Sequence, residues 1–271
     1  MAACSTLTFQ HLILDYYDHY GRHDLPWRLP DADGFDPYKV MVSELMLQQT
    51  QVSRVIPKFE QFVTVFPTVA DLAAVQLGDV LKLWSGLGYN RRAQYLHRAA
   101  QIIVTDFSSV MPSTIEALRT LPGVGVNTAA AIAAYSYNQP VIFVETNIRS
   151  VYIHHFFAGA NNVTDAEILA KVAATLDVTN PRCWYWALMD YGTYLKNTTG
   201  NAARRSASYS RQSVFAGSRR QMRGQVIKLL GQKPQSLTQL RTVLADERLT
   251  EVLQSLVAEG LINQEADNYH L

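Results

Sequence analysis

The sequence is poor in cysteine, has no long uninterrupted apolar run and has no leader-like start. Its two cysteines, Cys4 and Cys183, can form at most one bridge, which excludes a disulfide framework and a four-cysteine metal site. No segment approaches the roughly 18 apolar residues of a membrane-spanning helix, and no basic start leads into an apolar stretch and a cleavage site. We therefore expect a globular, cytoplasmic protein that is neither secreted nor inserted in a membrane.

Acidic residues are also missing from residues 191–245, although the formal net charge of the whole chain is only +1. The same stretch carries ten basic residues, namely Lys196, Arg204, Arg205, Arg211, Arg219, Arg220, Arg223, Lys228, Lys233 and Arg241. Such a run is either an ordinary solvated face or a surface for a polyanion, because Arg and Lys among small polar residues suit sugar-phosphate contacts. The sequence leaves both interpretations open.

What the chain does contain is helical periodicity. Apolar residues recur at three- and four-residue spacing, convincing alternating strands are scarce before residue 260, and 48% hydrophobic residues suffice for a core. The pattern predicts a mainly α protein. One helix should start near Pro37 and bend or restart at Pro57, and a short one should be capped by Thr68 or Asp71. One more helix should begin at Thr114 and stop at the glycines that follow, and the next should end at about Tyr137. Three others are expected at 91–105, 147–157 and 165–176.

A change in composition near residue 212 predicts a domain boundary. The segment Asn197–Arg220 is rich in Ser, Asn, Gly and Arg and poor in apolar residues. Beyond it, three short helices and two strands around an "EADN" turn follow the order of a winged helix, with a small packing or dimerisation domain as the alternative. We expect a two-lobed helical core at 1–212, with one lobe at 31–137 flanked by 1–30 and 138–212, and a winged-helix-like domain at 213–271.

The stretch "LPGVGVNTAAAI", residues 121–132, predicts a phosphate site. Gly123 and Gly125 allow positive φ and bring bare backbone to the surface, and Asn127 or Thr128 should start an alanine-rich helix. Backbone N–H groups at such a helix start favour an anion. Many Gly-x-Gly turns are only helix breaks, but this one lies between two predicted helices.

Six motifs, taken in order, resemble the helix-hairpin-helix (HhH-GPD) DNA glycosylase superfamily, and in particular its MutY-like adenine glycosylase branch. They are "LPWR" at 25–28, "SELMLQQTQV" at 43–52, "FPTVADLA" at 66–73, "LWSGLGYNRRAQYL" at 83–96, "LPGVGVNTAAAI" at 121–132 and "VETNIRSV" at 144–151. The resemblance covers about residues 9–195. It implies the glycosylase core and base excision from double-stranded DNA.

The resemblance places two carboxylates at catalytic positions. Glu44 matches the glutamate that protonates adenine and handles water, and Glu145 matches the family's catalytic aspartate, which stabilises the cationic sugar. Glutamate at 145 is a departure, because one extra methylene moves the carboxylate by roughly 1.5 Å. The residues alone also allow structural roles for both acids. Glu44 could be an exposed helix residue, and Glu145 could be an acid at a helix start or an ion-pair partner of Arg149. Asn147 either donates a hydrogen bond to the reacting centre or caps a helix.

The resemblance also implies which residues contact the base and the DNA. Asn127 stands where bifunctional relatives carry a Schiff-base lysine, which implies a monofunctional enzyme, and it should contact the flipped base. Trp27 and Arg28 either line the same base pocket or anchor the N-terminal segment. Gln49 and Tyr89, supported by Gln48, match residues that wedge into the base stack, although an aromatic residue in a helical protein is more often core. Phosphate contacts are expected at Gly123, Gly125, Thr128, Arg204, Arg205, Arg219, Arg220 and Arg223.

Two further departures concern the cofactor and the substrate. The superfamily's usual iron–sulfur cluster needs four cysteines after the segment that resembles "ALMDYGTYL", and no cysteine follows Cys183, so we expect no cofactor. Relatives often hold a monovalent cation at the hairpin, and the sequence leaves this open. Residues after 213 do not resemble the domain with which MutY recognises oxidised guanine.

Together these observations predict a monomeric, monofunctional DNA glycosylase, nucleoid-associated if the source is bacterial, that removes a mispaired adenine. A uracil or thymine mismatch glycosylase acting opposite guanine is one alternative, because such relatives share the core. A catalytically inactive protein that binds damaged or unusually structured DNA is the other.

Overall fold

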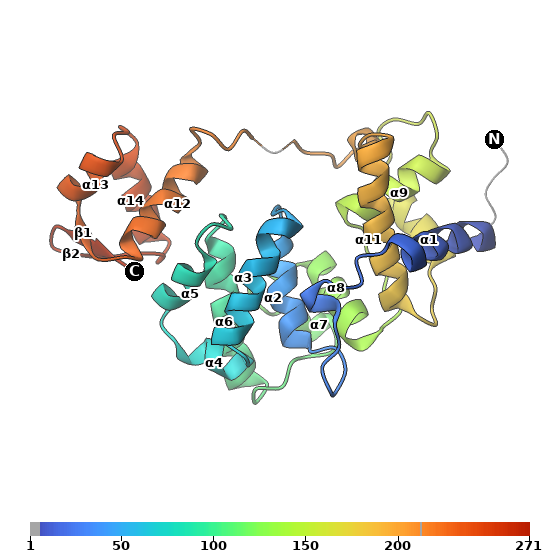
Figure 1. Ribbon diagram of the computed structural model, residues 1–271, viewed down its shortest axis with the longest axis horizontal. Helices are drawn as coiled ribbons and strands as arrows, with labels where there is room; N and C mark the ends of the chain where they lie inside the picture. Colours follow the sequence, from blue (N-terminus) through green and yellow to red (C-terminus); the bar gives the residue numbers. More distant parts are fainter. Residues whose placement is uncertain (1–5, 212) are drawn as a thin grey trace. The chain divides into compact units, whose positions relative to one another are not determined.

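The computed structural model describes residues 6–211 and 213–271, and helices dominate it, as predicted (Figure 1). The chain forms two compact units. Unit 1 holds the described residues up to 40 together with 113–119 and 124–211, and unit 2 holds 41–112, 120–123 and the described residues beyond 211. Cys4 lies outside the described residues, and Cys183 is a free thiol. Among the described helices, none combines the length and apolar character needed to cross a membrane.

Unit 1 is built around the packing of three helices. Helix α11 (Pro181–Thr198) packs against both α9 (Thr146–Phe156) and α1 (Thr6–Tyr20). The fully buried ring of Phe9 lies 5.5 Å from that of Tyr152 and 5.8 Å from that of Trp184, measured between centroids. The remaining elements of the unit are η1 (Pro26–Arg28), α7 (Ile115–Leu118), α8 (Val126–Tyr137), α10 (Asp165–Thr175) and η2 (Ala202–Arg205).

In unit 2, helix α6 (Arg91–Asp106) packs against α4 (Val69–Ala74) and α5 (Leu77–Trp84). Both Thr68 and Asp71 cap α4, since each side chain accepts a hydrogen bond from the other's backbone N–H. The prediction that one helix runs from Pro37 to a bend at Pro57 is wrong. Helix α2 (Pro37–Leu47) ends before Gln49, and α3 (Val52–Val65) runs through Pro57.

The break between α2 and α3 lies at Gln49. Gln49 has a φ of 55°, a left-handed conformation that a right-handed helix cannot include. Pro57 costs α3 one backbone hydrogen bond, yet the helix continues because its apolar face buries Val55, Phe59 and Phe62.

The C-terminal part of unit 2 has the winged-helix order predicted from the sequence. Helix α12 (Arg219–Leu230) is followed by β1 (Gln235–Ser236), α13 (Leu237–Val243), α14 (Leu249–Ala258), β2 (Asn263–Glu265) and β3 (Asn268–His270). The strands form an antiparallel sheet in the order β1-β3-β2, with Glu265 opposite Asn268 across the "EADN" turn. Strand β1 escaped prediction because two residues are too few to show an alternating pattern.

Candidate functional site

The predicted glycine hairpin uses its two glycines in different ways. Gly123 has a φ of 80°, and a Cβ there would come within 2.8 Å of the Tyr95 Cβ, so both conformation and packing require glycine. Gly125 has an extended φ of −81° and occupies the N-cap of α8, where an added Cβ would meet open space. Helix α8 starts at Val126, earlier than predicted. Its first N–H groups therefore face an open, exposed approach that suits a phosphate.

Glu145 lies at the N-cap of α9, a partly exposed position at the start of the helix. Its carboxylate makes no capping hydrogen bond within the part of the chain that the structure describes. Burial raises the pKa of Glu145, and the positive charge of Arg149 opposes that rise. The guanidinium of Arg149 is directed at Asp165, with N–O distances of 2.9 and 2.8 Å, so the alternative of an Arg149–Glu145 pair gives way to an Arg149–Asp165 pair.

Two asparagines flank this acid within unit 1. The side-chain amide of Asn127 donates to the carbonyl of Val144 over 3.0 Å, which ties the start of α8 to the residue before Glu145. Asn147 does not cap α9, because the N-cap is Glu145. Its side-chain amide instead donates to Thr193 Oγ1 and the Met189 carbonyl of α11 at 3.2 and 3.4 Å.

The close approach of α9 and α11 explains how Asn147 is held. A Cβ at Gly192 would come within 2.5 Å of the Asn147 carbonyl oxygen, so only glycine permits this contact. Asn127, Glu145 and Asn147 therefore lie near one another at the starts of α8 and α9. Their roles at a reacting centre stay predictions.

Glu44 lies in α2 of unit 2, flanked by the buried residues Ser43 and Leu45. Its side chain is only partly exposed and has partners within the protein. The alternative of an exposed helix residue is therefore wrong. The apolar run "VMVSELML" buries the helix on both sides of this acid.

Trp27 and Arg28 are both buried in η1, the short helical turn of "LPWR". The guanidinium of Arg28 makes two hydrogen bonds to Asp190 on α11, over 2.8 and 3.0 Å, and lies 5.4 Å from the centroid of the Trp186 ring. Arg22 also bonds to Asp190 through its backbone N–H, at 2.7 Å. Arg28 thus anchors η1 to α11, as one of the two interpretations of "LPWR" expects. The base-pocket role of Trp27 and Arg28 stays a prediction.

The two predicted wedge residues share an unusual backbone conformation. Gln49 is exposed with a φ of 55°, and Tyr89, half-buried, has a φ of 49°. Left-handed backbone at residues other than glycine costs of the order of 1 to 3 kcal/mol and persists only where the surroundings impose it. Each residue lies at the tip of a loop, one between α2 and α3 and the other between α5 and α6. The structure thus presents both residues on short, strained turns.

Arg92, which sequence reasoning missed, connects these two loops. Its buried guanidinium donates at 2.6 to 3.4 Å to the carbonyls of Leu45, Met46, Gln48, Leu87 and Gly88 and to the hydroxyl of Thr50. These bonds occupy the last carbonyls of α2 and the turn before Tyr89. Burial lowers the pKa of Arg92 to about 10, so it remains charged at neutral pH. In the sequence, its role was indicated only by its position three residues after the predicted wedge residue Tyr89.

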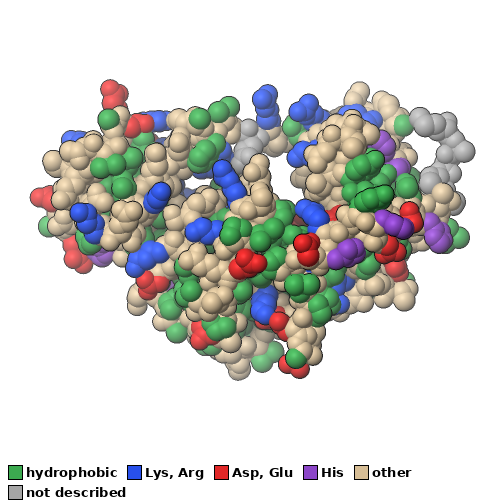
Figure 2. Space-filling model, in the orientation of Figure 1, with side chains coloured by type: hydrophobic (Ala, Val, Ile, Leu, Met, Phe, Trp, Pro, Cys, Tyr) green, Lys and Arg blue, Asp and Glu red, His purple; other side chains and the backbone are tan. Residues whose placement is uncertain are grey.

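The predicted phosphate contacts of the basic segment occupy different environments. Arg204 is exposed, whereas Arg205 donates to the Phe157 and Ile153 carbonyls at the end of α9, over 2.9 and 3.2 Å. Arg219 pairs with Glu251 and Arg223 pairs with Glu259, at 2.7 and 2.6 Å. Figure 2 shows Lys and Arg side chains scattered among polar and apolar ones on the face in view, without one continuous basic patch.

The segment after α11 is where the resemblance puts the cysteines of a cluster. Its backbone instead bonds to residue 163, with Val163 donating to the Arg205 carbonyl over 3.0 Å and Ala207 donating to the Val163 carbonyl over 2.9 Å. No thiolate is available here, because no cysteine follows Cys183 in the sequence. Throughout residues 6–211 and 213–271, no three His, Cys, Asp or Glu side chains are grouped so as to hold a metal ion. The residues present therefore do not fit an iron–sulfur cluster.

Comparison with known proteins gives a consistent result. Residues 42–174 match the family described as HhH-GPD superfamily base excision DNA repair protein. The chain is 36% identical to the adenine DNA glycosylase of Mycolicibacterium smegmatis over 94% of its own length and 92% of that relative. It is 32% identical to the adenine DNA glycosylase of Mycobacterium tuberculosis over 94% of its own length and 90% of the relative.

Solved structures share the fold at lower identity. A thermostable thymine-DNA glycosylase aligns with a TM-score of 0.61 and 23% identity, over 69% of this chain and 85% of the other. An endonuclease III trapped in a covalent intermediate with DNA aligns with a TM-score of 0.57 and 16% identity, over 70% of this chain and 87% of the other.

Proposed function

This chain belongs to the HhH-GPD superfamily of base excision DNA repair proteins, in its adenine DNA glycosylase branch, and we propose that it hydrolyses the N-glycosidic bond of a mispaired adenine in duplex DNA. The observation that carries the proposal is the grouping of Asn127, Glu145 and Asn147 at the starts of α8 and α9, beside the glycine hairpin. The loops that carry Gln49 and Tyr89 in unit 2 would insert into the base stack when the target base is flipped out.

In the proposed reaction, the flipped nucleotide places its sugar against Glu145. As the bond to the base breaks, positive charge develops on the sugar, and the ionised carboxylate of Glu145 stabilises it. The family resemblance gives Glu44 the role of the acid that protonates the leaving adenine and then accepts a proton from the attacking water. The Asn127 bond to the Val144 carbonyl and the Asn147 bonds to α11 hold the backbone on either side of Glu145, so that its position is fixed before the substrate arrives.

We also propose that the enzyme is monofunctional and works as a monomer without a cluster. The side chain of Asn127 is an amide, which cannot form a Schiff base with the sugar. The segment at 201–207, bonded to residue 163 and capping α9, holds the end of that helix through hydrogen bonds. Purified protein without bound iron that still releases base supports this part of the proposal, whereas activity that depends on bound iron contradicts it.

The experiment that tests the proposal compares four duplexes under single-turnover conditions. They contain adenine opposite guanine, adenine opposite 8-oxoguanine, uracil opposite guanine and thymine opposite guanine. Free adenine from either of the first two supports the proposal, and their ratio measures the preference for the opposite base. Release of only uracil or thymine replaces adenine with the mismatch alternative. Tight binding of all four without release of any base contradicts catalysis on these substrates.

A further inference from the structure

We propose that Arg220 is a positioning residue that couples the winged-helix part of unit 2 to the wedge residue Tyr89. This inference rests on the proposed function, because it concerns how the wedge is prepared for the DNA. Arg220 lies in the first turn of α12, far from Tyr89 in sequence. Its guanidinium donates a hydrogen bond to the Tyr89 hydroxyl, and its Cζ lies 4.9 Å from the centroid of the Tyr89 ring.

Tyr89 is contacted by two guanidinium groups from different parts of unit 2. Arg92 lies 5.4 Å from the same ring centroid and fixes the backbone of the loop through its bonds to the carbonyls. Arg220 contacts the ring and holds the hydroxyl, which the backbone of the loop cannot do. A guanidinium over an aromatic ring is attracted by the negative face of the ring, and the hydrogen bond adds to this attraction. Arg92 therefore fixes the backbone of the loop before α6, and Arg220 fixes the orientation of the Tyr89 ring.

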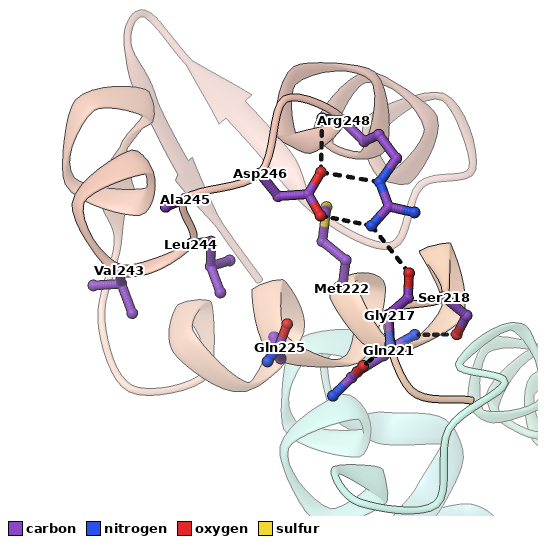
Figure 3. Close-up of a pocket in the computed structure, with 10 residues that line it drawn as sticks. All are labelled: Gly217, Ser218, Gln221, Met222, Gln225, Val243, Leu244, Ala245, Asp246 and Arg248. Carbon is purple, nitrogen blue, oxygen red and sulfur yellow. Dashed lines mark hydrogen bonds and ion pairs between the residues drawn. The ribbon is translucent and has the colours of Figure 1, made fainter. Parts of the chain in front are cut away.

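Arg220 is itself fixed by the winged-helix part. Ser218 caps α12, and the carbonyl of Gly217 accepts a hydrogen bond of 3.0 Å from Arg248, which is paired with Asp246. Figure 3 shows this arrangement around a cavity of about 210 Å³ between the start of α12 and the loop before α14. The guanidinium of Arg220 also donates to the Ser213 carbonyl over 3.2 Å.

A second set of contacts ties the same region to the helix that follows Tyr89. Glu259, just after α14, accepts hydrogen bonds of 2.6 Å from Arg223 and 2.8 Å from Arg91. Gln94 donates to the backbone carbonyl of Glu259 over 2.8 Å. Since Arg91 and Gln94 belong to the first turn of α6, the winged-helix part is attached on the C-terminal side of the wedge as well.

These contacts separate Arg220 from its basic neighbours. Arg219 and Arg223 are paired with the carboxylates of Glu251 and Glu259, whereas Arg220 donates to the Tyr89 hydroxyl and the Ser213 carbonyl. The donors of the Arg220 guanidinium are therefore directed at Tyr89 and Ser213 and not at a carboxylate. Arg220 acts on base flipping through Tyr89 and contributes little as an independent phosphate contact.

The test uses the full chain with Arg220→Ala, Tyr89→Phe and the double variant. Lys228→Ala is the matched control, because Lys228 is an exposed basic residue near the other end of α12. Flipping is followed by 2-aminopurine fluorescence next to the target base, and the single-turnover rate and the DNA Kd are measured separately. We expect Arg220→Ala to lower both the flipping signal and the rate about tenfold, equivalent to 1.4 kcal/mol, with a smaller effect in the Tyr89→Phe background. Arg220→Lys should restore part of the rate.

The outcomes distinguish the two proposals. If wild-type protein releases no base from any duplex, the proposed function fails, whatever the variants do. If the wild type is active but Arg220→Ala flips the base as well as the wild type does, the coupling is wrong. A weaker Kd with a lower salt slope and unchanged flipping also overturns it, because Arg220 is then only a phosphate contact.

Discussion

At the scale of single residues, the central feature is an acid held in a place that disfavours its charge. Glu145 caps no N–H group of α9, and burial raises its pKa. A carboxylate that is poorly solvated before the reaction is free to stabilise a cation that appears during it. The same burial must lower the stability of the folded protein at neutral pH, because unfolding would return the carboxylate to water.

The first prediction follows from the sign of this pKa shift. Because the folded state binds the proton of Glu145 more readily than the unfolded state, the stabilising contribution is complete below the unfolded pKa. It is lost as the pH rises through the higher, folded pKa. Glu145→Gln resembles the protonated acid, so it should melt at a higher temperature than the wild type at pH 7 to 8. Calorimetry should show that this difference shrinks toward about pH 4. A lower Tm at neutral pH would show that the charge is well solvated or paired.

A second residue-scale prediction concerns Arg92. Replacing it with Ala removes one donor from each of five carbonyls and a hydroxyl, although the Gly88 carbonyl keeps its bond from Trp84 Nε1. We expect a loss of about 3 kcal/mol in the free energy of unfolding. Hydrogen exchange should increase at 48–51 and 86–90 in particular. Arg92→Lys keeps the charge but lacks the forked donors, so it should lie between Ala and wild type. Unchanged exchange in both loops would show that Gln49 and Tyr89 hold their conformations without Arg92.

At the scale of elements, the glycine hairpin separates folding from binding. Gly123 is packed against Tyr95 in a left-handed conformation, and Gly125 faces open space in an extended one. Gly123→Ala should therefore destabilise the protein by about 1 to 3 kcal/mol. Gly125→Ala should leave its stability near that of wild type but weaken DNA binding, because the new methyl group blocks the approach of a phosphate to α8. Denaturant unfolding and a binding titration of the same two variants test the pair. Equal losses of stability in both would contradict the different roles.

Elements also show how far the sequence could predict this molecule. The helix starts at Thr68 and Thr114 and the order of the winged helix follow from local patterns and are confirmed. The break at Gln49 was missed because the donor that accommodates the end of α2 is Arg92, on a helix far along the chain. The contact of Arg220 with Tyr89 was missed for the same reason, since neither residue's neighbours in the sequence signal it. The predicted roles of Glu44, Glu145 and Asn127 come from the family resemblance and stay predictions.

At the scale of the whole molecule, the basic stretch contains two kinds of arginine. Arg205 is bonded to carbonyls of α9, whereas Arg204 beside it is exposed. Arg204→Ala should lower the salt slope of DNA binding by about one and leave the Tm unchanged. Arg205→Ala should instead lower the Tm, with little change in slope for protein that is folded. A binding titration at several salt concentrations, paired with thermal melts, distinguishes the two, and the reverse pattern would contradict this assignment.

The most direct test of the account is the release of free adenine from a duplex with adenine opposite guanine, measured for wild type and Glu145→Gln under single-turnover conditions. We predict that the wild type releases adenine and leaves an intact abasic strand. Glu145→Gln should bind the duplex with similar affinity but release adenine at least about 100-fold more slowly. Adenine release by Glu145→Gln at the wild-type rate, or no adenine from the wild type, would contradict the central claim.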